Sequence, residues 1–192
     1  LQKPATACTG VDIQVKGILT KPDYLTFWQG VDYINDGYIW SFPKVKSNVT
    51  NFGAGFLIST KSDKCIEEVA FDWLKKLFPN AKVVENHVVG GLIPVSGNLE
   101  RTVKDRFLLV GDAAHHTNPL TGGGIATAMR AGLLASAVVG DGLRSGELSE
   151  SSLRLYEKLC RENFGQKHLR LMKFRRFLLS QTRDDQIRVY KL

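Results

Sequence analysis

Apolar and polar positions in the first hundred residues follow the pattern of β-strands. Five stretches rich in β-branched and aromatic residues end at Gly, Pro or Asn, and they cover residues 14–18, 24–29, 38–42, 49–58 and 83–89. Short stretches of this composition, separated by such breaks, predict strands joined by turns. An antiparallel sheet is the simplest arrangement for them.

One helical pattern interrupts the strands. Apolar residues recur there at steps of three and four, namely Ile66, Val69, Ala70, Trp73, Leu74 and Leu77. Pro79 follows and predicts the end of the helix, because proline cannot continue it. We expect this helix to cover one face of the sheet.

The pattern becomes helical after Val110. It predicts helices over about 124–139 and 151–164, and a basic helix beyond them. The predicted fold class is therefore α+β, with an antiparallel sheet first, a strand-helix element next, and helices at the carboxyl-terminal end.

Composition is that of an ordinary soluble globular protein, with 43% hydrophobic and 23% charged residues. No apolar run reaches the roughly 20 residues that span a bilayer, and no signal peptide is visible. We therefore expect a cytoplasmic protein. Three widely spaced cysteines, Cys8, Cys65 and Cys160, lack the pairing of a zinc or redox motif. We expect reduced, mostly buried thiols and no metal.

The segment from Arg106 to Gly132, RFLLVGDAAHHTNPLTGGGIATAMRAG, indicates the chemistry most directly. An apolar strand at 107–110 ends in Gly-Asp, and glycines at 122–124 open a helical segment. Unpaired amides at a helix start attract electron-rich ligand atoms, and glycines let such atoms come close to the backbone. Asp112 is placed to accept hydrogen bonds from ligand hydroxyls.

This segment resembles the second flavin motif of flavoproteins built like p-hydroxybenzoate hydroxylase, which is Gly-Asp with a proline seven residues later. Together with GYIWSFP at 37–43 and GGLIPVSG at 90–97, the chain most resembles the geranylgeranyl reductase family. Archaeal members of that family saturate isoprenoid chains of membrane lipids. The resemblance implies an FAD-dependent oxidoreductase that reduces carbon–carbon double bonds.

The resemblance also implies binding residues. The cofactor-binding candidates are Gly111, Asp112, Pro119, Gly122, Gly123, Gly124 and Ile125. In this interpretation Asp112 holds the ribityl hydroxyls, and amides at the helix start stabilise negative charge on reduced flavin. The substrate-binding candidates are Tyr38, Trp40, Phe42, Pro43, Gly91 and Pro94. No residue is assigned as the proton donor.

Tyr38, Trp40 and Phe42 are two residues apart, so they share one face of a strand. Such rings form either core or the lining of an apolar channel, and the resemblance favours a lipid cavity. The family pattern carries a proline three residues before the tyrosine, where this chain has Asn35. The turn into the strand is therefore expected to differ.

The phosphate-binding turn of such flavoproteins, G-x-G-x-x-G, occurs nowhere in this sequence. The chain thus resembles a carboxyl-terminal part, and we expect a separate amino-terminal FAD-binding segment as its partner. We expect a lipid-binding domain at 1–100, part of the FAD domain at 101–145 and basic helices at 146–192. The electron donor, NAD(P)H or ferredoxin, stays open.

Most of the net charge of +7 lies near the carboxyl-terminal end. Residues 160–192 carry nine Lys or Arg against three acids, interleaved with Leu169, Met172, Phe174, Phe177 and Leu178. This pattern suits a basic amphipathic helix, which either contacts an anionic membrane surface or packs on the missing flavin domain. Charge alone does not support nucleic-acid binding.

Two further features keep alternatives open. The double glycine at 90–91 is expected to break a strand, either beside the flavin ring or at a simple bulge. His115 and His116 either lie near the flavin as proton donors or cap loop backbone.

Rival functions are a flavin monooxygenase of the p-hydroxybenzoate hydroxylase type and a flavin-less lipid-binding or docking module.

Overall fold

The structure, a computed structural model, describes residues 6–30, 32–182 and 185. It divides into two compact units, whose main segments are Ala7–Leu92 and Ile93–Ser180. We call them the sheet unit and the helical unit. The finer division at residues 100 and 145 stays a prediction.

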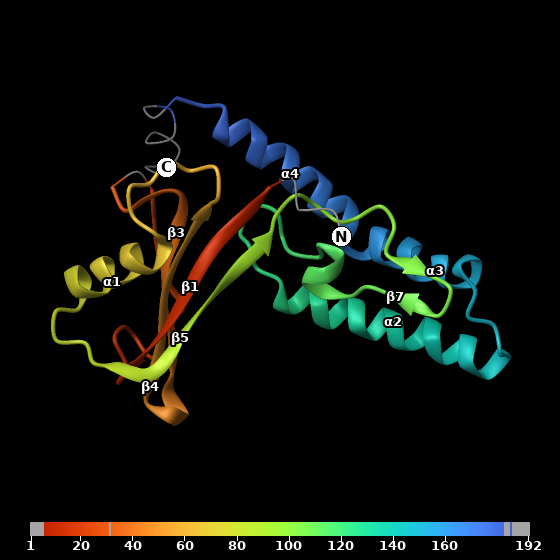
Figure 1. Cartoon of the computed structure of the whole chain (residues 1–192), viewed down its shortest axis with the longest axis horizontal. Helices are drawn as coiled ribbons and strands as arrows, with labels where there is room; N and C mark the ends of the chain where they lie inside the picture. Colours follow the sequence, from red (N-terminus) through yellow and green to blue (C-terminus); the bar gives the residue numbers. More distant parts are fainter. Residues whose placement is uncertain (1–5, 31, 183–184, 186–192) are drawn as a thin grey trace. The chain divides into compact units, whose positions relative to one another are not determined.

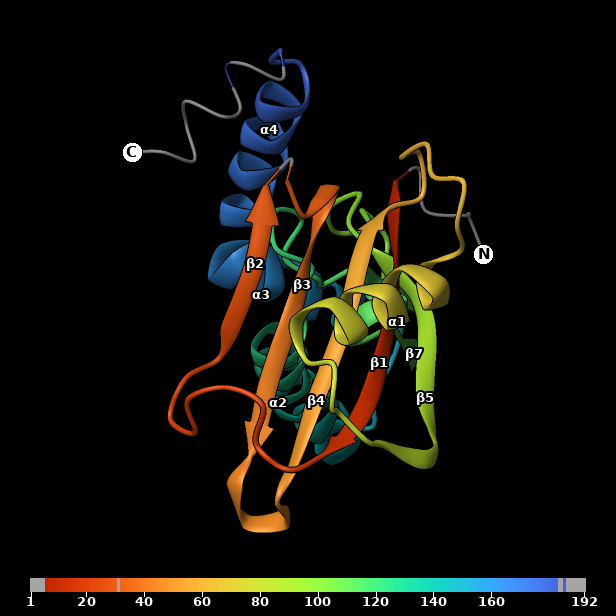
Figure 2. The ribbon, with the colours of Figure 1, turned by 90° about the vertical axis from the view of Figure 1, so that its left-hand side faces the viewer.

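The sheet unit contains a five-stranded sheet (Figures 1 and 2). Its strands are β1 (Ala7–Lys16), β2 (Thr26–Gly30), β3 (Ile34–Lys44), β4 (Val49–Leu57) and β5 (Val83–Pro94). Their order is β2-β3-β4-β1-β5, and β2 with β3, β3 with β4 and β4 with β1 are antiparallel. The predicted antiparallel sheet is confirmed for these pairs. Within β3, near its start, Asp36 has a left-handed conformation, with φ of 52°.

Helix α1 (Ile66–Leu77) lies across one face of the sheet, as predicted (Figure 2). The Glu68 side chain accepts a 2.9 Å hydrogen bond from the Cys65 amide and so caps the helix start. Ala70 and Leu74 pack against buried side chains of the sheet, among them Ile39 and Phe52. This core occupies one face of the sheet and leaves the opposite face uncovered by α1.

The double glycine does not break β5, which continues through it to Pro94. That prediction was wrong. A Cβ on Gly90 would lie 3.2 Å from the carbonyl oxygen of Gly10, so the close neighbour is strand β1 of the same sheet. Glycine keeps this pairing tight rather than bending the strand.

The helical unit contains a two-stranded ribbon and three α-helices (Figure 1). The helices are α2 (Ile125–Ser145), α3 (Glu150–Cys160) and α4 (Gln166–Leu179), and a single π-helical turn, η3 (Arg161–Gly165), joins α3 to α4. Ala131, Ala135 and Val138 of α2 pack against Leu153 and Tyr156 of α3. Small residues on α2 let the two helices approach closely.

The strand predicted at 107–110 is shorter than expected. Strand β7 covers only Phe107–Leu108 and pairs antiparallel with β6 (Val103–Lys104). The Tyr156 hydroxyl donates a 2.9 Å hydrogen bond to the carbonyl of Leu109, so a side chain satisfies the backbone where the ladder stops.

Helix α4 buries a different face from the one its apolar residues suggest. Leu169 and Phe174 are about half exposed, whereas His168 and Arg175 are buried. Polar side chains with specific partners occupy the inner face. The predicted contact of the apolar residues with a membrane or with a flavin domain stays a prediction. Three bases of the predicted basic segment, Arg183, Arg188 and Lys191, lie outside the described residues.

The cysteines are free thiols, as expected, but they are not mostly buried. Cys160 is buried among the helices, Cys8 is half-buried and Cys65 is exposed at the start of α1. Cys65 is exposed because it caps a helix end instead of packing in the core.

Candidate functional site

The loop from Gly111 to Ile125 in the helical unit brings the cofactor candidates together. Directly after Val110 the chain turns through η2 (Gly111–Ala114), and it enters α2 at Ile125. Gly111, His115 and Gly122 have φ of 65°, 55° and 72°. Glycine adopts this left-handed conformation without the steric cost that other residues pay, which explains two of the three.

Asp112 lies beside the start of α2. Its Oδ1 accepts a 3.1 Å hydrogen bond from the Thr117 hydroxyl, and a Cβ on Gly124 would lie 3.0 Å from the same oxygen. The side chain is exposed. A carboxylate offers about four acceptor positions, so Asp112 retains capacity for ligand hydroxyls.

Asn118 holds the loop in shape, a role that the sequence analysis missed. Its Oδ1 accepts hydrogen bonds from the amides of Leu120 and Thr121, at 2.9 and 3.2 Å. Its backbone N–H donates to the carbonyl of Gly123, and its carbonyl accepts from Gly122. Asn before Pro is a turn signal that could have indicated this.

Gly123 has no packing reason to be glycine. The nearest atom to a Cβ built there is the Thr121 hydroxyl at 3.4 Å, an ordinary contact, and the residue is exposed. Its φ also lies outside the left-handed range. Because glycine has no side chain, the space beside the start of α2 stays open to a ligand. The backbone amides at this helix start point into that space.

Pro119 is buried and links the loop to α4. Its carbonyl oxygen accepts a 2.6 Å hydrogen bond from Nη1 of Arg175, which is itself buried. Arg175 is one of the nine basic residues of 160–192, and this role was not predicted from the sequence. The sequence does contain a signal that Arg175 is buried. It lies at helical steps of three and four from His168, Leu171, Met172 and Leu178, which places it on the same helix face as these residues.

The two histidines of the loop are buried and held neutral. Burial lowers the pKa of His115, whose Nδ1 lies 3.1 Å from the Ser96 hydroxyl. Burial, with His168 and His115 nearby, lowers the pKa of His116 to about 4. The His116 ring packs edge-on against Phe164, with ring centres 4.9 Å apart. His116 is thus a packed, neutral ring near pH 7.

The substrate candidates Tyr38, Trp40 and Phe42 lie on the sheet face opposite α1. The rings of Trp40 and Phe42 are nearly parallel, and their centres are 6.2 Å apart. The Tyr38 ring meets the Trp40 ring edge-on, with the two centres 5.8 Å apart. Phe27 of β2 packs edge-on against both Tyr38 and Phe42. We call these four rings the aromatic face.

Trp40 extends across the neighbouring strand to β1. A Cβ on Gly53 would lie 2.3 Å from the Trp40 ring, so only glycine fits beneath it. The indole Nε1 donates a 2.9 Å hydrogen bond to Oδ1 of Asp12. Burial raises the pKa of Asp12, and the bond from Trp40 and the charge of Lys44 partly oppose this. The position of Asp12 was not predicted from the sequence, although a lone carboxylate in GVDIQV is a recognisable signal.

The remaining substrate candidates lie apart from these rings. Pro43 pairs with Thr50 beyond the end of β2, and Gly91 is exposed with no atom near a Cβ built on it. Pro94 is buried and belongs to the helical unit. The structure thus groups three of the six candidates, Tyr38, Trp40 and Phe42, on one surface.

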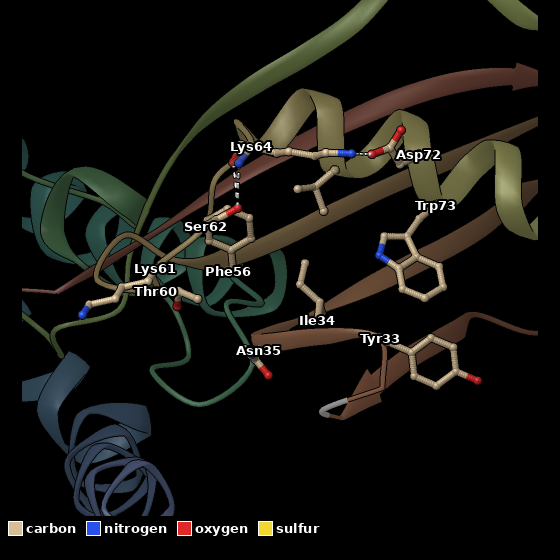
Figure 3. A pocket seen from close by; sticks show the side chains of 11 residues that line it. Tyr33, Ile34, Asn35, Phe56, Thr60, Lys61, Ser62, Lys64, Asp72 and Trp73 are labelled. Atoms are coloured by element: carbon tan, nitrogen blue, oxygen red, sulfur yellow. Dashed lines mark hydrogen bonds and ion pairs between the residues drawn. The ribbon is translucent and has the colours of Figure 1, made fainter. Parts of the chain in front are cut away.

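A recess between α1 and β3 contains none of the candidates (Figure 3). Tyr33 and Trp73 lie on one side of it, and the exposed ion pair of Lys64 with Asp72 lies across its edge. Exposed pairs of this kind contribute little stability, and the recess is open to solvent. Within the described residues, no cluster of side chains has the composition of a metal site.

Comparison with known proteins identifies what the sheet unit resembles. Residues 6–93, which coincide with that unit, match the geranylgeranyl reductase catalytic domain. The family resemblance is confirmed. The chain is 39% identical over 163 residues to a digeranylgeranylglycerophospholipid reductase of Methanothrix thermoacetophila, covering 85% of this chain and 41% of that protein. A second such reductase, from Methanococcoides burtonii, is 37% identical over 85% of this chain and 39% of its own length.

Solved structures agree with the fold. A geranylgeranyl bacteriochlorophyll reductase-like protein of Thermoplasma acidophilum matches with a TM-score of 0.83 and 27% identity, over 96% of this chain and 46% of that one. A flavin-dependent brominase matches with a TM-score of 0.60 and 18% identity, over 81% and 41% of the two chains. The mixed fold with an antiparallel sheet is therefore confirmed. The chain spans about two fifths of the length of the curated relatives that it matches.

Proposed function

We propose that this chain takes part in the FAD-dependent reduction of carbon–carbon double bonds in isoprenoid chains of membrane lipids. The observation that carries the proposal is the similarity of 85% of the chain to digeranylgeranylglycerophospholipid reductases. The position of the YxWxFP rings supports it, because they gather on the sheet face that α1 leaves uncovered.

The loop from Gly111 to Ile125 fits the flavin end of FAD. Asp112 retains acceptors for ribityl hydroxyls, and the open position at Gly123 lets a ring approach the amides at the start of α2. These amides favour an electron-rich ligand atom. FAD, when bound and reduced, supplies the hydride, and the protein supplies binding, orientation and exclusion of water.

A second segment is proposed as a partner for the helical unit. Ile125, Met129 and Leu133 form an exposed apolar stripe on α2, between 65% and 82% accessible. Within the described residues nothing covers this stripe. A strand, G-x-G-x-x-G turn and helix that hold the ADP half of FAD would bury it. This chain without that segment is then expected to bind FAD weakly.

Contact with a membrane surface is the third part of the proposal. The exposed side of α4 carries Arg170, Lys173 and Arg176 together with Phe174, which is 48% accessible. Bases attract anionic headgroups, and an aromatic ring enters the interface beside them. No helix in the described part of the chain is long and apolar enough to cross a bilayer.

The proposed membrane contact is tested by vesicle sedimentation. The double variant Lys173→Glu with Phe174→Ser is expected to lose binding to vesicles rich in anionic lipid. The double variant Lys75→Glu with Lys76→Glu, on exposed α1, is the matched control and is expected to bind like the unchanged protein. Equal binding of both variants would contradict the contact through α4.

The reduction itself is tested with the complete flavin-loaded protein, which contains this chain and the proposed FAD-binding segment, and a geranylgeranylated glycerolipid. We expect chemically reduced flavin to be reoxidised by the lipid in the absence of oxygen, with saturation of its double bonds. Oxygenated product, formed from a small aromatic substrate instead, would favour a monooxygenase. Absence of visible flavin absorbance even when the chain is purified together with the proposed FAD-binding segment would favour a lipid-binding module without flavin.

A further inference from the structure

Asp12 is the one carboxylate of β1 and lies beside the aromatic face. It pairs in register with Gly53 of β4, and Trp40 pairs with the same glycine from the other side. The indole therefore bridges β4 and donates its 2.9 Å hydrogen bond to Asp12 Oδ1. A carboxylate at this position is only partly exposed and has large rings on one side.

We propose that Asp12 takes up a proton when an isoprenoid chain covers the aromatic face, and that it donates this proton during reduction of the chain's double bonds. This inference rests on the proposed function. An apolar chain laid over Trp40 excludes water from Asp12, and loss of water disfavours a charged carboxylate. Burial by the protein already raises the pKa of Asp12 in the chain alone.

The groups around Asp12 permit this protonation. On β3 the titratable groups near it are Tyr38 and Lys44, and Lys44 is the one whose charge favours the ionised carboxylate. Strand β4 has no titratable residue. On β1 itself lie Cys8 and exposed Lys16, and neighbouring β5 carries exposed Glu85 and His87. The hydrogen bond from Trp40 is thus the stronger opponent of proton uptake, and Lys44 is the opponent among these titratable groups.

The chemistry of the substrate requires such a proton. Each saturated double bond gains one proton and one hydride. The O–H bond of Asp12 breaks as a new C–H bond forms at one alkene carbon, and the other carbon receives the hydride from the reduced cofactor. Asp12 remains as a carboxylate and is reprotonated from water after the product leaves. An alkene without an activating group develops positive charge when protonated, and the faces of aromatic rings attract such charge.

The first test measures binding of geranylgeraniol, in detergent, to the 192-residue chain. Calorimetry in buffers of different ionisation enthalpy is expected to detect proton uptake on binding. Affinity is expected to fall as the pH rises from the pKa of free Asp12 to that of bound Asp12, by up to about tenfold per pH unit. Asp12→Asn is expected to remove both effects, because the amide oxygen still accepts from Trp40 but does not titrate.

Lys44→Met is expected to keep the pH dependence of lipid binding that Asp12→Asn removes. Removing its charge is expected to shift the pH dependence of binding to higher pH, because that charge lowers the pKa of Asp12. Proton uptake that persists in Asp12→Asn would overturn the inference. Failure of the unchanged chain to bind at any pH would overturn the proposed lipid-binding function as well.

The second test uses the flavin-loaded protein in a single turnover. At saturating lipid, Asp12→Asn is expected to slow flavin reoxidation by about a hundredfold or more, which is the usual contribution of a general acid. Turnover equal to that of the unchanged protein would overturn the role of Asp12 as donor while leaving the reductase function intact.

Discussion

The guanidinium Nη1 of Arg175 donates a 2.6 Å hydrogen bond to the carbonyl oxygen of Pro119. Both residues are buried, and they join α4 to the loop that carries the cofactor candidates. On the same helix, His168 Nδ1 lies 2.9 Å from Asn98 Oδ1. Helix α4 is therefore part of the support of the proposed flavin site.

Replacing Arg175 with Met is expected to loosen this loop. A hydrogen bond from a charged group contributes about 1.5–3 kcal/mol, so the free energy of unfolding should fall by about that amount. Amide hydrogen exchange at Leu120–Gly124 should become faster. Arg176→Met is the matched control, because its side chain is exposed, and it should change stability by less than about 0.5 kcal/mol. Unchanged exchange in Arg175→Met would contradict the supporting role.

Trp40→Ala and Ile39→Ala form a matched pair on opposite faces of β3. Ile39 is fully buried under α1, so its truncation should cost about 2–5 kcal/mol of stability. Trp40 is only half-buried, and its loss should impair lipid binding and turnover more than folding. Thermal unfolding and turnover per folded molecule, measured on both variants, separate the two effects. A Trp40→Ala variant that is strongly destabilised yet fully active would exclude a role in lipid binding.

Gly123→Val tests the open position at the start of α2. The chain itself has room for a side chain there, so we expect nearly normal stability but loss or misplacement of flavin. Asp112→Ala removes an acceptor for flavin hydroxyls and should weaken FAD binding roughly tenfold to more than a hundredfold. Titration of the complete protein, freed of flavin and including the proposed FAD-binding segment, with FAD checks both. If both variants keep normal affinity, Gly111 to Ile125 is only a connection between strand and helix.

His116 predicts a pH dependence of stability. Its pKa is lowered by burial to about 4 in the folded protein, below the ordinary value of 6.5. The unfolded chain therefore binds more protons between these values, and stability should fall as the pH drops from about 6.5 towards 4. The loss from this residue is on the order of 3 kcal/mol. Thermal unfolding at several pH values should show a weaker dependence for His116→Phe. An equal dependence in both proteins would assign the effect to other groups.

Local patterns allowed parts of the fold to be predicted closely. The spacing from Ile66 to Leu77 and the proline after it predicted α1 with its observed bounds. The period of two at Tyr38, Trp40 and Phe42 placed the rings on one face, because strand geometry alone determines this. The family resemblance then gave the hypothesis that this face binds lipid.

Contacts between distant segments could not be predicted in the same way. The carbonyl of Leu109, just after β7, accepts its hydrogen bond from Tyr156, far along the chain. Gly90 is glycine because Gly10 approaches it, and Arg175 is buried because Pro119 accepts its hydrogen bond. A single sequence records none of these pairings, since each depends on which elements become neighbours after folding.

The most direct test of the proposed function is anaerobic incubation of the flavin-loaded, chemically reduced protein with digeranylgeranylglycerophospholipid, followed by mass spectrometry of the lipid. We expect the lipid to gain two hydrogen atoms for each double bond reduced, in step with reoxidation of the flavin. A protein that binds flavin and lipid but returns the lipid with unchanged mass would contradict the assignment.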